Sequence, residues 1–328
     1  MVKNILSLFS ACFFSLSGIA QLHWVNVDAA YQPLPPSIHV YTSTSPLEGK
    51  PNIAYYITAD LKDPDIEFTV DTTRNRRLTP GAFYEKNDHP VLVVNCTFFS
   101  FETNRSLNTV IRNKNLLAYN VHAVAGRGKD SLQYLHYFRS GIGINRKRQA
   151  DIAWIFSDSL SKFAYASQQA ISPLKDSVKS HELKFYQQYV LSNKGPKHSV
   201  LKKWKMETAV GGGPVLIQEG KIHITNEEEK MFTGKAINDK HPRTAMGYTK
   251  DNILVILVVQ GRQPGLAEGA TLLQEAALLK DLGCEEALNL DGGGSSCMLI
   301  NGKETIRPSD KEGQRAVPAV FIIKSKEK

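Results

Sequence analysis

The sequence predicts an α+β protein, with a mixed β-sheet core and flanking helices in a single large domain. Three observations support this. Short β-prone runs recur along the chain, helical patterns are few, and the two do not alternate strictly as they do in a parallel α/β fold. The 328 residues are enough to bury a sizeable core.

The strand predictions rest on runs rich in β-branched and aromatic residues. Tight turns are expected about Asn113 to Asn115, at Glu219-Gly220 and at Asn301-Gly302, each between two such runs. The main predicted strands cover residues 53–59, 66–71, 91–95, 151–157, 252–262, 287–291 and 316–324.

Three segments have helical character: 79–88, 181–192 and 270–284. The last is the clearest, because Thr271 is a good N-cap and Gln274, three residues later, completes a capping box. Gly283 is expected to end this helix in a left-handed conformation.

The first twenty residues form a segment of their own. Lys3 precedes a short apolar run that ends with small residues up to Ala20, which is the pattern of a cleaved secretory signal peptide. Secretion or export to a periplasm is therefore expected. A lipid-modified Cys12 is the alternative, although the apolar run before it is short.

The remaining chain is predicted to have two parts. Residues 21–89 supply N-terminal strands that pack on the main domain, and 21–50, rich in Pro, Ser and Thr, are expected to wrap its surface. Residues 90–328 form the main domain, with an insertion or lid at 158–206, where Gln, Lys and Ser are frequent. No segment after the signal is long and apolar enough to span a membrane.

The distribution of charge indicates which kinds of binding partner to expect. The net charge is +8, but basic residues are scattered, with one local concentration at 194–205. An exported protein rarely meets nucleic acid, so none is expected, and anionic sugars or phosphate diesters are better candidates.

Of the cysteines at 96, 284 and 297, Cys284 and Cys297 are the expected disulfide pair. No spacing of Cys or His predicts a metal site, and no cofactor is expected.

The most informative segment is LNLDGGGSSCML at 288–299. An apolar run stops at Asp291, and three glycines and two serines follow. Glycine is costly in backbone entropy, so a run of three predicts a sharp turn or a close approach to the backbone. The exposed N–H groups and hydroxyls of such a turn suit an anion or a sugar.

Other polar side chains also follow predicted strands. Asn95 and Gln260 end strands as Asp291 does, and a glycine cluster lies at 211–213. Sites are often built where strands end, so these segments are expected to share a cleft. Arg243, beside a proline, and Arg262 are phosphate-binding candidates. Glu275 lies in the first turns of the predicted helix and could reach a site at the helix N-terminus.

Together these motifs resemble the phosphodiester glycosidase family. The resemblance covers about residues 90–324 and rests on LNLDGGGSSCM, VGGGPVLIQEGK, HPRTAMGY, QGR, the helix at 270–284 and the NCTFF turn. Two positions depart from the family pattern: Cys96 and Thr97 replace two glycines, and Gln260 replaces an aspartate.

The resemblance implies a catalytic domain acting on a carbohydrate phosphodiester. It implies chemistry at Asp291, Glu275 and Arg243. The residues implied to bind substrate are Asn95, Gly212, Gly213, Arg262, Thr271, Gly292, Gly293, Gly294 and Ser295.

The expected reaction is hydrolysis of the bond between sugar C1 and the phosphate oxygen, with N-acetylglucosamine as one example of the sugar. A phosphomonoester is a good leaving group, so the site needs a cation and a carboxylate more than a general acid. Asp291 or Glu275 could be the base or nucleophile. Two alternatives are a non-catalytic polysaccharide-binding protein that uses the same cleft and a metal-dependent phosphodiesterase.

Overall fold

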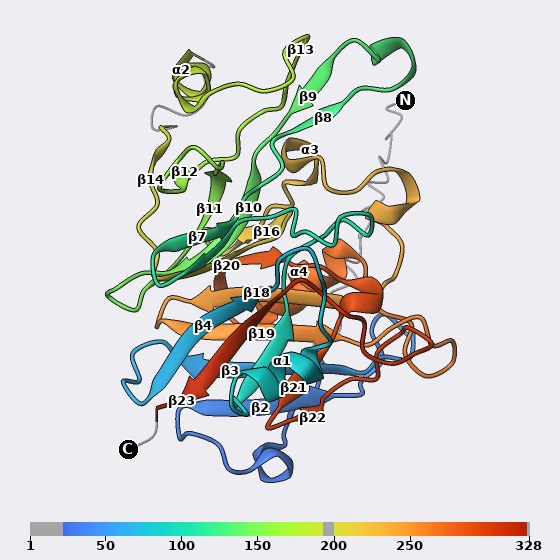
Figure 1. The fold of residues 1–328 in the computed structure, drawn as a ribbon. Helices are drawn as coiled ribbons and strands as arrows, with labels where there is room; N and C mark the ends of the chain where they lie inside the picture. Colours follow the sequence, from blue (N-terminus) through green and yellow to red (C-terminus); the bar gives the residue numbers. More distant parts are fainter. Residues whose placement is uncertain (1–21, 193–199, 327–328) are drawn as a thin grey trace, which may run out of the picture.

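The computed structural model describes residues 22–192 and 200–326, and Figure 1 shows its arrangement. The protein is richer in strand than the α+β prediction, with 38% strand and 15% helix. The α-helices are α1 (Pro80–Lys86), α2 (Leu183–Ser192), α3 (Asn226–Glu229) and α4 (Leu272–Asp281). None of the helices in the described part is long and apolar enough to cross a membrane.

The largest sheet has eight strands in the order β1-β2-β3-β19-β18-β20-β16-β17. Residues 21–50 do more than wrap the surface, because β2 pairs with β3 along its full length, and Ile38 and Val40 alternate with polar positions and are buried. The strands are β1 (Val25–Asn26), β2 (Ile38–Ser43), β3 (Ala54–Asp60), β16 (Val215–Gln218), β17 (Lys221–Ile222), β18 (Arg243–Thr249), β19 (Ile253–Val259) and β20 (Cys284–Asn289).

The other sheets have five, seven and three strands. The five-stranded sheet comprises, in order, β22 (Lys303–Glu304), β21 (Met298–Ile300), β5 (Leu92–Asn95), β23 (Ala319–Ser325) and β4 (Ile66–Thr72). The seven-stranded sheet comprises β14 (Lys202–Lys203), β12 (Tyr165–Ser167), β11 (Ala150–Phe156), β10 (Arg139–Ile144), β15 (Thr208–Gly211), β6 (Val110–Arg112) and β7 (Asn115–Ala118). The small sheet comprises β13 (Leu174–Asp176), β9 (Tyr134–His136) and β8 (Ala123–Ala125).

The named strands pair antiparallel, so the prediction of a mixed sheet is wrong. The helical crossover between β19 and β20 does make those two strands run in the same direction. However, β18 lies between them and pairs antiparallel with both. The sequence predicts the two strands and the helix between them, but not which strand lies between the two in the sheet.

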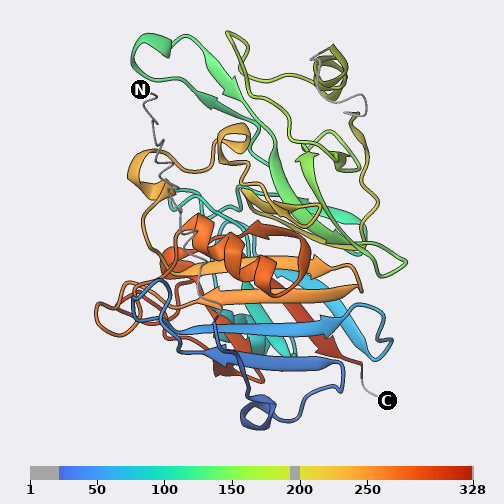
Figure 2. The same ribbon diagram turned by 180° about the vertical axis from the view of Figure 1, so that it is seen from behind.

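The eight-stranded sheet is covered on both faces. In β19 the side chains of Leu254, Ile256 and Val258 enter the main core, which is shared with the five- and seven-stranded sheets. The alternate residues Val255 and Leu257 face a second core beneath α4. Figure 2 shows α4 lying across this face. Burial on both faces explains why the strand is an unbroken apolar run.

The local predictions for α4 are confirmed. Thr271 Oγ1 accepts a hydrogen bond from the Gln274 N–H at 3.1 Å, and the reciprocal bond completes the capping box. Gly283 follows the helix with φ of 82°. The helix therefore begins at a fixed point, next to the start of β18, where Arg243 donates a hydrogen bond to the Ala270 carbonyl.

The N-terminal segment and the predicted insertion are both hydrogen-bonded to the rest of the domain. The segment 21–89 contributes β1 to β3 to the eight-stranded sheet, and β4 pairs with β23. In 158–206, β12 and β14 extend one side of the seven-stranded sheet, and β13 joins β8 and β9. The predicted signal peptide lies outside the described residues.

The expected Cys284–Cys297 disulfide is absent, since Cys96, Cys284 and Cys297 are all free and buried. Cys284 lies in the core beneath α4, whereas Cys297 lies in a separate core beneath α1. The two residues flank one strand and its turn in sequence, but their side chains enter different layers of the fold.

Candidate active site

The ends of β5 and β20 meet, although the two strands belong to different sheets. Asn95, the last residue of β5, donates from Nδ2 to the main-chain carbonyl of Asp291 at 2.5 Å. The Asp291 N–H donates to the Cys96 carbonyl at 2.8 Å. These bonds fix Asp291 at the junction of two sheets.

Asn95 is fully buried, and its other hydrogen bonds also lie inside the protein. Its Oδ1 accepts from Thr244 Oγ1 and from the Cys297 N–H, each at 3.0 Å. The structure thus gives Asn95 a positioning role. That it also binds substrate stays a prediction.

The Asp291 carboxyl is held in a covered position. Its Oδ2 is buried and has no hydrogen-bond partner among the described residues. Burial raises the pKa of Asp291 to about 7, against the opposing effects of the Ser295 hydroxyl, the Arg315 charge and the Gly292 N–H. A carboxyl with this pKa exchanges its proton near neutrality, which is typical of catalytic groups.

Three glycines are needed after Asp291 because the turn passes close to other groups. A Cβ on Gly292 would lie 2.8 Å from the Pro242 carbonyl oxygen, and one on Gly294 would overlap Arg315 Nη2. Gly293 has φ of 62° and opens the short helix Gly293–Ser295. The turn is therefore a tightly packed element and not a flexible link.

Arg262 is the exposed cation of the group. Its guanidinium lies against the turn, where a Cβ on Gly293 would be 3.0 Å from Nη2, and the same nitrogen lies 3.4 Å from His241 Nδ1. Burial and the charges of Arg243 and Arg262 lower the pKa of His241, so the imidazole is neutral at pH 7.

Arg315 also adjoins the turn, and sequence reasoning did not find it. Two of its nitrogens donate to the Asp310 carboxylate at 2.7 Å each, and Nη1 lies 3.5 Å from Ser295 Oγ. Its guanidinium also lies over the Phe101 ring, 5.5 Å from the centroid. Its only sequence signal is a basic residue in the loop before the last strand.

Arg243 and Glu275 form a separate, deeper group beneath the start of α4. Arg243 is 2% exposed and donates from Nε to the Ala270 carbonyl at 2.8 Å. Glu275 is fully buried, and neither carboxyl oxygen has a hydrogen-bond partner in the described chain. Burial raises the pKa of Glu275 to about 8, and the Arg243 charge opposes that shift. Burial also lowers the pKa of Arg243.

The remaining predicted residues have structural contacts. Gly212 and Gly213 are buried, and their N–H groups donate to the carbonyls of Ser140 and Asn289. A Cβ on Gly213 would overlap a carboxyl oxygen of Glu229. Thr271 caps α4. For these three predicted residues, substrate contact stays a prediction.

Glu229 is a buried carboxylate that sequence reasoning also missed. Its oxygens accept hydrogen bonds from the Ser140 N–H and hydroxyl, the Val215 N–H, Thr225 Oγ1 and Trp154 Nε1, at 2.6 to 3.2 Å. Because it joins β10 and β11 to β16, we regard it as a structural link between two sheets.

Two cavities lie away from this group. One of about 420 Å³ lies beside the seven-stranded sheet, and its lining includes Phe163, Trp204 and Lys203. The other, of about 320 Å³, lies beside α2 and is lined by His122, His181 and other residues. Neither includes a predicted site residue.

Comparison with protein-family profiles identifies the family of this chain. A profile of the phosphodiester glycosidase family matches residues 88–324. The chain belongs to the phosphodiester glycosidase family. The strand ends, the glycine turn and the arginines described above all lie within the matched region.

Similarity to individual members is local. The chain is 41% identical over 93 residues to an uncharacterized prophage-derived protein, YomE, of Bacillus subtilis, covering 28% of this chain and 14% of that protein. It is 32% identical over 103 residues to the mouse N-acetylglucosamine-1-phosphodiester alpha-N-acetylglucosaminidase, covering 29% of this chain and 20% of the enzyme. The matches thus span a fifth or less of these relatives.

Solved structures share the fold over most of the chain. The catalytic domain of the zebrafish N-acetylglucosamine-1-phosphodiester alpha-N-acetylglucosaminidase, auto-inhibited by its pro-peptide, superposes with a TM-score of 0.57 at 18% identity. That match covers 93% of this chain and 88% of the zebrafish chain. A hypothetical protein from Synechocystis gives a TM-score of 0.56 at 17% identity, covering 89% of this chain and 64% of that chain.

Gln260, one of the two predicted departures from the family pattern, is 4% exposed. Its Oε1 accepts from the Arg307 N–H at 2.9 Å, and its Nε2 donates to Gln263 Oε1 at 2.9 Å. The amide therefore holds two loops together. An aspartate here could not make the donor contact.

Proposed function

We propose that this member of the family is a hydrolase that cleaves the bond between sugar C1 and the phosphate oxygen of a sugar-1-phosphate diester. N-acetylglucosamine is the sugar we favour, because the mammalian relatives are named for that substrate. The observation that carries the proposal is the Asp291 carboxyl, whose buried Oδ2 has no hydrogen-bond partner among the described residues and which adjoins a turn bordered by Arg262 and Arg315.

The proposed chemistry follows from the leaving group. Water adds to C1, the C1–O bond breaks, and the phosphate departs with the bridging oxygen as a weakly basic monoester. Such a group needs little protonation, so the main demand is to stabilise positive charge at C1. The Asp291 carboxylate can meet that demand, either by contact with the developing cation, as a nucleophile, or as the base for water.

The substrate phosphate is proposed to lie at the Gly292–Ser295 turn. Arg262 is exposed there, and a guanidinium suits a phosphate because it donates two parallel hydrogen bonds. Arg315 is already engaged with Asp310 and contributes a positive charge at longer range.

Arg243 and Glu275 are proposed as positioning residues, because both side chains are buried beneath the start of α4. Arg243 ties the start of β18 to the loop before α4 through the Ala270 carbonyl. Together with burial, which is the larger cause, its charge lowers the pKa of His241 beside Arg262.

We propose that the protein is exported. The support is the sequence pattern of residues 1–20, with cleavage near Ala20. Fractionation of cells that express the full chain, with mass analysis of the mature N-terminus, tests this. A mature protein that still begins at Met1 in the cytosol would contradict it.

The reaction is tested with an N-acetylglucosamine-α-phosphoryl-methyl ester in oxygen-18 water. Label in the free sugar supports cleavage of the C1–O bond, whereas label in the phosphate identifies a phosphodiesterase. Asp291→Asn is expected to fold and to lose turnover. Glycan affinity without turnover on any diester would favour a binding protein instead.

A further inference from the structure

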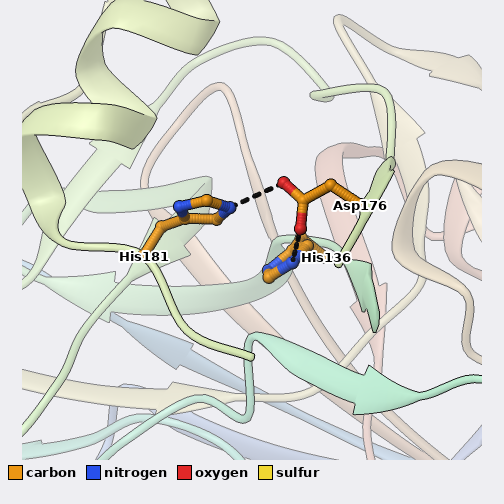
Figure 3. A group of neighbouring side chains, drawn as sticks. All are labelled: His136, Asp176 and His181. Carbon is orange, nitrogen blue, oxygen red and sulfur yellow. Dashed lines mark hydrogen bonds and ion pairs between the residues drawn. The ribbon is translucent and has the colours of Figure 1, made fainter. Parts of the chain in front are cut away.

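The small sheet and α2 bring together three side chains that commonly bind metals, far from the candidate active site in sequence. His136 is the last residue of β9, Asp176 is the last residue of β13, and His181 lies just before α2. One ligand atom from each lies within 4.8 Å of the others. Figure 3 shows both imidazoles directed at the Asp176 carboxylate.

The ring nitrogens converge on oxygen atoms. His136 Nε2 lies 3.2 Å from Asp176 Oδ1, and His181 Nε2 lies 2.7 Å from Oδ2. The Val178 carbonyl oxygen lies 3.0 Å from the same nitrogen of His136. Two imidazoles and a carboxylate thus lie close together, and a carbonyl oxygen adjoins one of the imidazoles.

A second contact orients the buried histidine. His136 is 1% exposed, and its Nδ1 lies 2.9 Å from the Tyr186 hydroxyl. Nε2 faces two acceptor oxygens and donates its proton to them; a metal bound there would replace that proton, and Nδ1 would then carry a proton and donate it to the Tyr186 hydroxyl. Histidines that bind metals usually have their second nitrogen held in this way.

We propose that His136, Asp176 and His181 form a site for a divalent transition metal, with Zn²⁺ the first candidate. Two histidine nitrogens and one carboxylate oxygen are a common zinc ligand set, and a water or the Val178 carbonyl completes four ligands. Sequence spacing did not predict this site, because 40 residues separate His136 from Asp176.

The surroundings allow an ion to enter. The side chains of His181 and Asp176 are 11% and 28% exposed, so solvent reaches these two ligands. His181 and Tyr186 also line the cavity of about 320 Å³ beside α2, which has room for a water ligand.

The expected role is to stabilise this part of the domain. A bound ion would join β9, β13 and the segment before α2, which lie at the opposite end of the molecule from β2 and β3 in Figure 1. Binding to the folded state raises its stability in proportion to the logarithm of metal concentration over the dissociation constant.

The test uses the chain without residues 1–20, first stripped with EDTA and then dialysed free of chelator. Co²⁺ is titrated while visible absorption is recorded, and Zn²⁺ is then added as a competitor. We expect one Co²⁺ per chain with the absorption bands of a four-coordinate site, displacement by Zn²⁺, and a higher melting temperature with Zn²⁺.

His181→Gln and Asp176→Asn are expected to weaken Zn²⁺ binding at least tenfold. His223→Gln, an exposed histidine elsewhere, is the matched control and should bind as the wild type does. Circular dichroism of the metal-free variants establishes that they fold. Absence of saturable binding in the wild type, or wild-type affinity in both ligand variants, would overturn the proposal.

Discussion

Asn95 holds the main chain of Asp291, 196 residues away, through a single hydrogen bond of 2.5 Å from Nδ2 to the carbonyl oxygen. The same side chain accepts bonds from Thr244 and from the Cys297 N–H. One buried amide thus connects β5, β18 and the loop before β21. The position of the proposed catalytic carboxyl depends on a residue that need not touch the substrate.

Asn95→Asp is expected to destabilise the protein by about 1 to 3 kcal/mol and to reduce activity. An ionised carboxylate would place an acceptor against the Asp291 carbonyl and lose the donor. Chemical denaturation and initial rates measure the two effects. Asn115→Asp, at an exposed position in β7, is the matched control and should change neither. Wild-type stability and rate in Asn95→Asp would contradict the assigned role.

The fold could be predicted from sequence where one local signal was sufficient. Three features depend only on nearby residues, and the structure has all of them: the helix cap at Thr271, the left-handed Gly283 and the apolar run of β19. The strand β2 was missed because only Ile38 and Val40 alternate within a segment rich in proline and serine.

The site was harder to predict, because its residues are far apart in sequence and are brought together only by the tertiary structure. Asp291 and its glycine turn were found from their sequence, whereas Arg315 has no motif and reaches Ser295 only through the fold. Sequence spacing also led to the wrong prediction of a Cys284–Cys297 disulfide. The spacing does not reveal that the two side chains lie in separate cores.

The pH dependence of kcat/KM is expected to show the titration of Asp291. Burial raises its pKa to about 7, so the free enzyme keeps the proton at pH 5 and loses it by pH 8. Because the proposed role needs the carboxylate, kcat/KM should rise with pH through about 7. A flat profile across this range, or a falling one, would require a different catalytic group.

Arg262→Ala is expected to raise KM for a phosphodiester about 10- to 100-fold, with little change in thermal stability. The side chain is exposed, so its loss leaves no buried group unpaired. Arg127→Ala changes the charge equally at an exposed position in the loop after β8 and is the control. If both variants bind the diester as the wild type does, Arg262 does not hold the phosphate.

Gly294→Ala is expected to disrupt the turn through contact with two side chains. Its Cβ would overlap both Arg315 Nη2 and Asp310 Oδ1. Separating that ion pair should lower stability by about 1 to 3 kcal/mol and abolish most turnover. Calorimetry and initial rates test this.

The comparison for this turn variant is Gly283→Ala. Gly283 has φ of 82°, but a Cβ added there would have no neighbour within 4 Å, so the variant measures backbone strain alone. It should lower stability by about 1 kcal/mol and leave kcat unchanged. Equal loss of activity in both variants would indicate a general effect of destabilisation.

Glu275→Gln is expected to alter how stability depends on pH. Burial raises the pKa of Glu275 from 4.5 to about 8, so the folded state binds this proton more tightly than the unfolded state between those values. Stability therefore falls as pH rises through that window, by about 1.4 kcal/mol for each unit of the pKa difference at most. Glutamine keeps the shape of the Glu275 side chain and cannot ionise.

Urea denaturation at pH 5 and pH 8 should show a smaller loss of stability in Glu275→Gln than in the wild type. An identical loss in the two proteins would mean that Glu275 does not contribute to the pH dependence of stability.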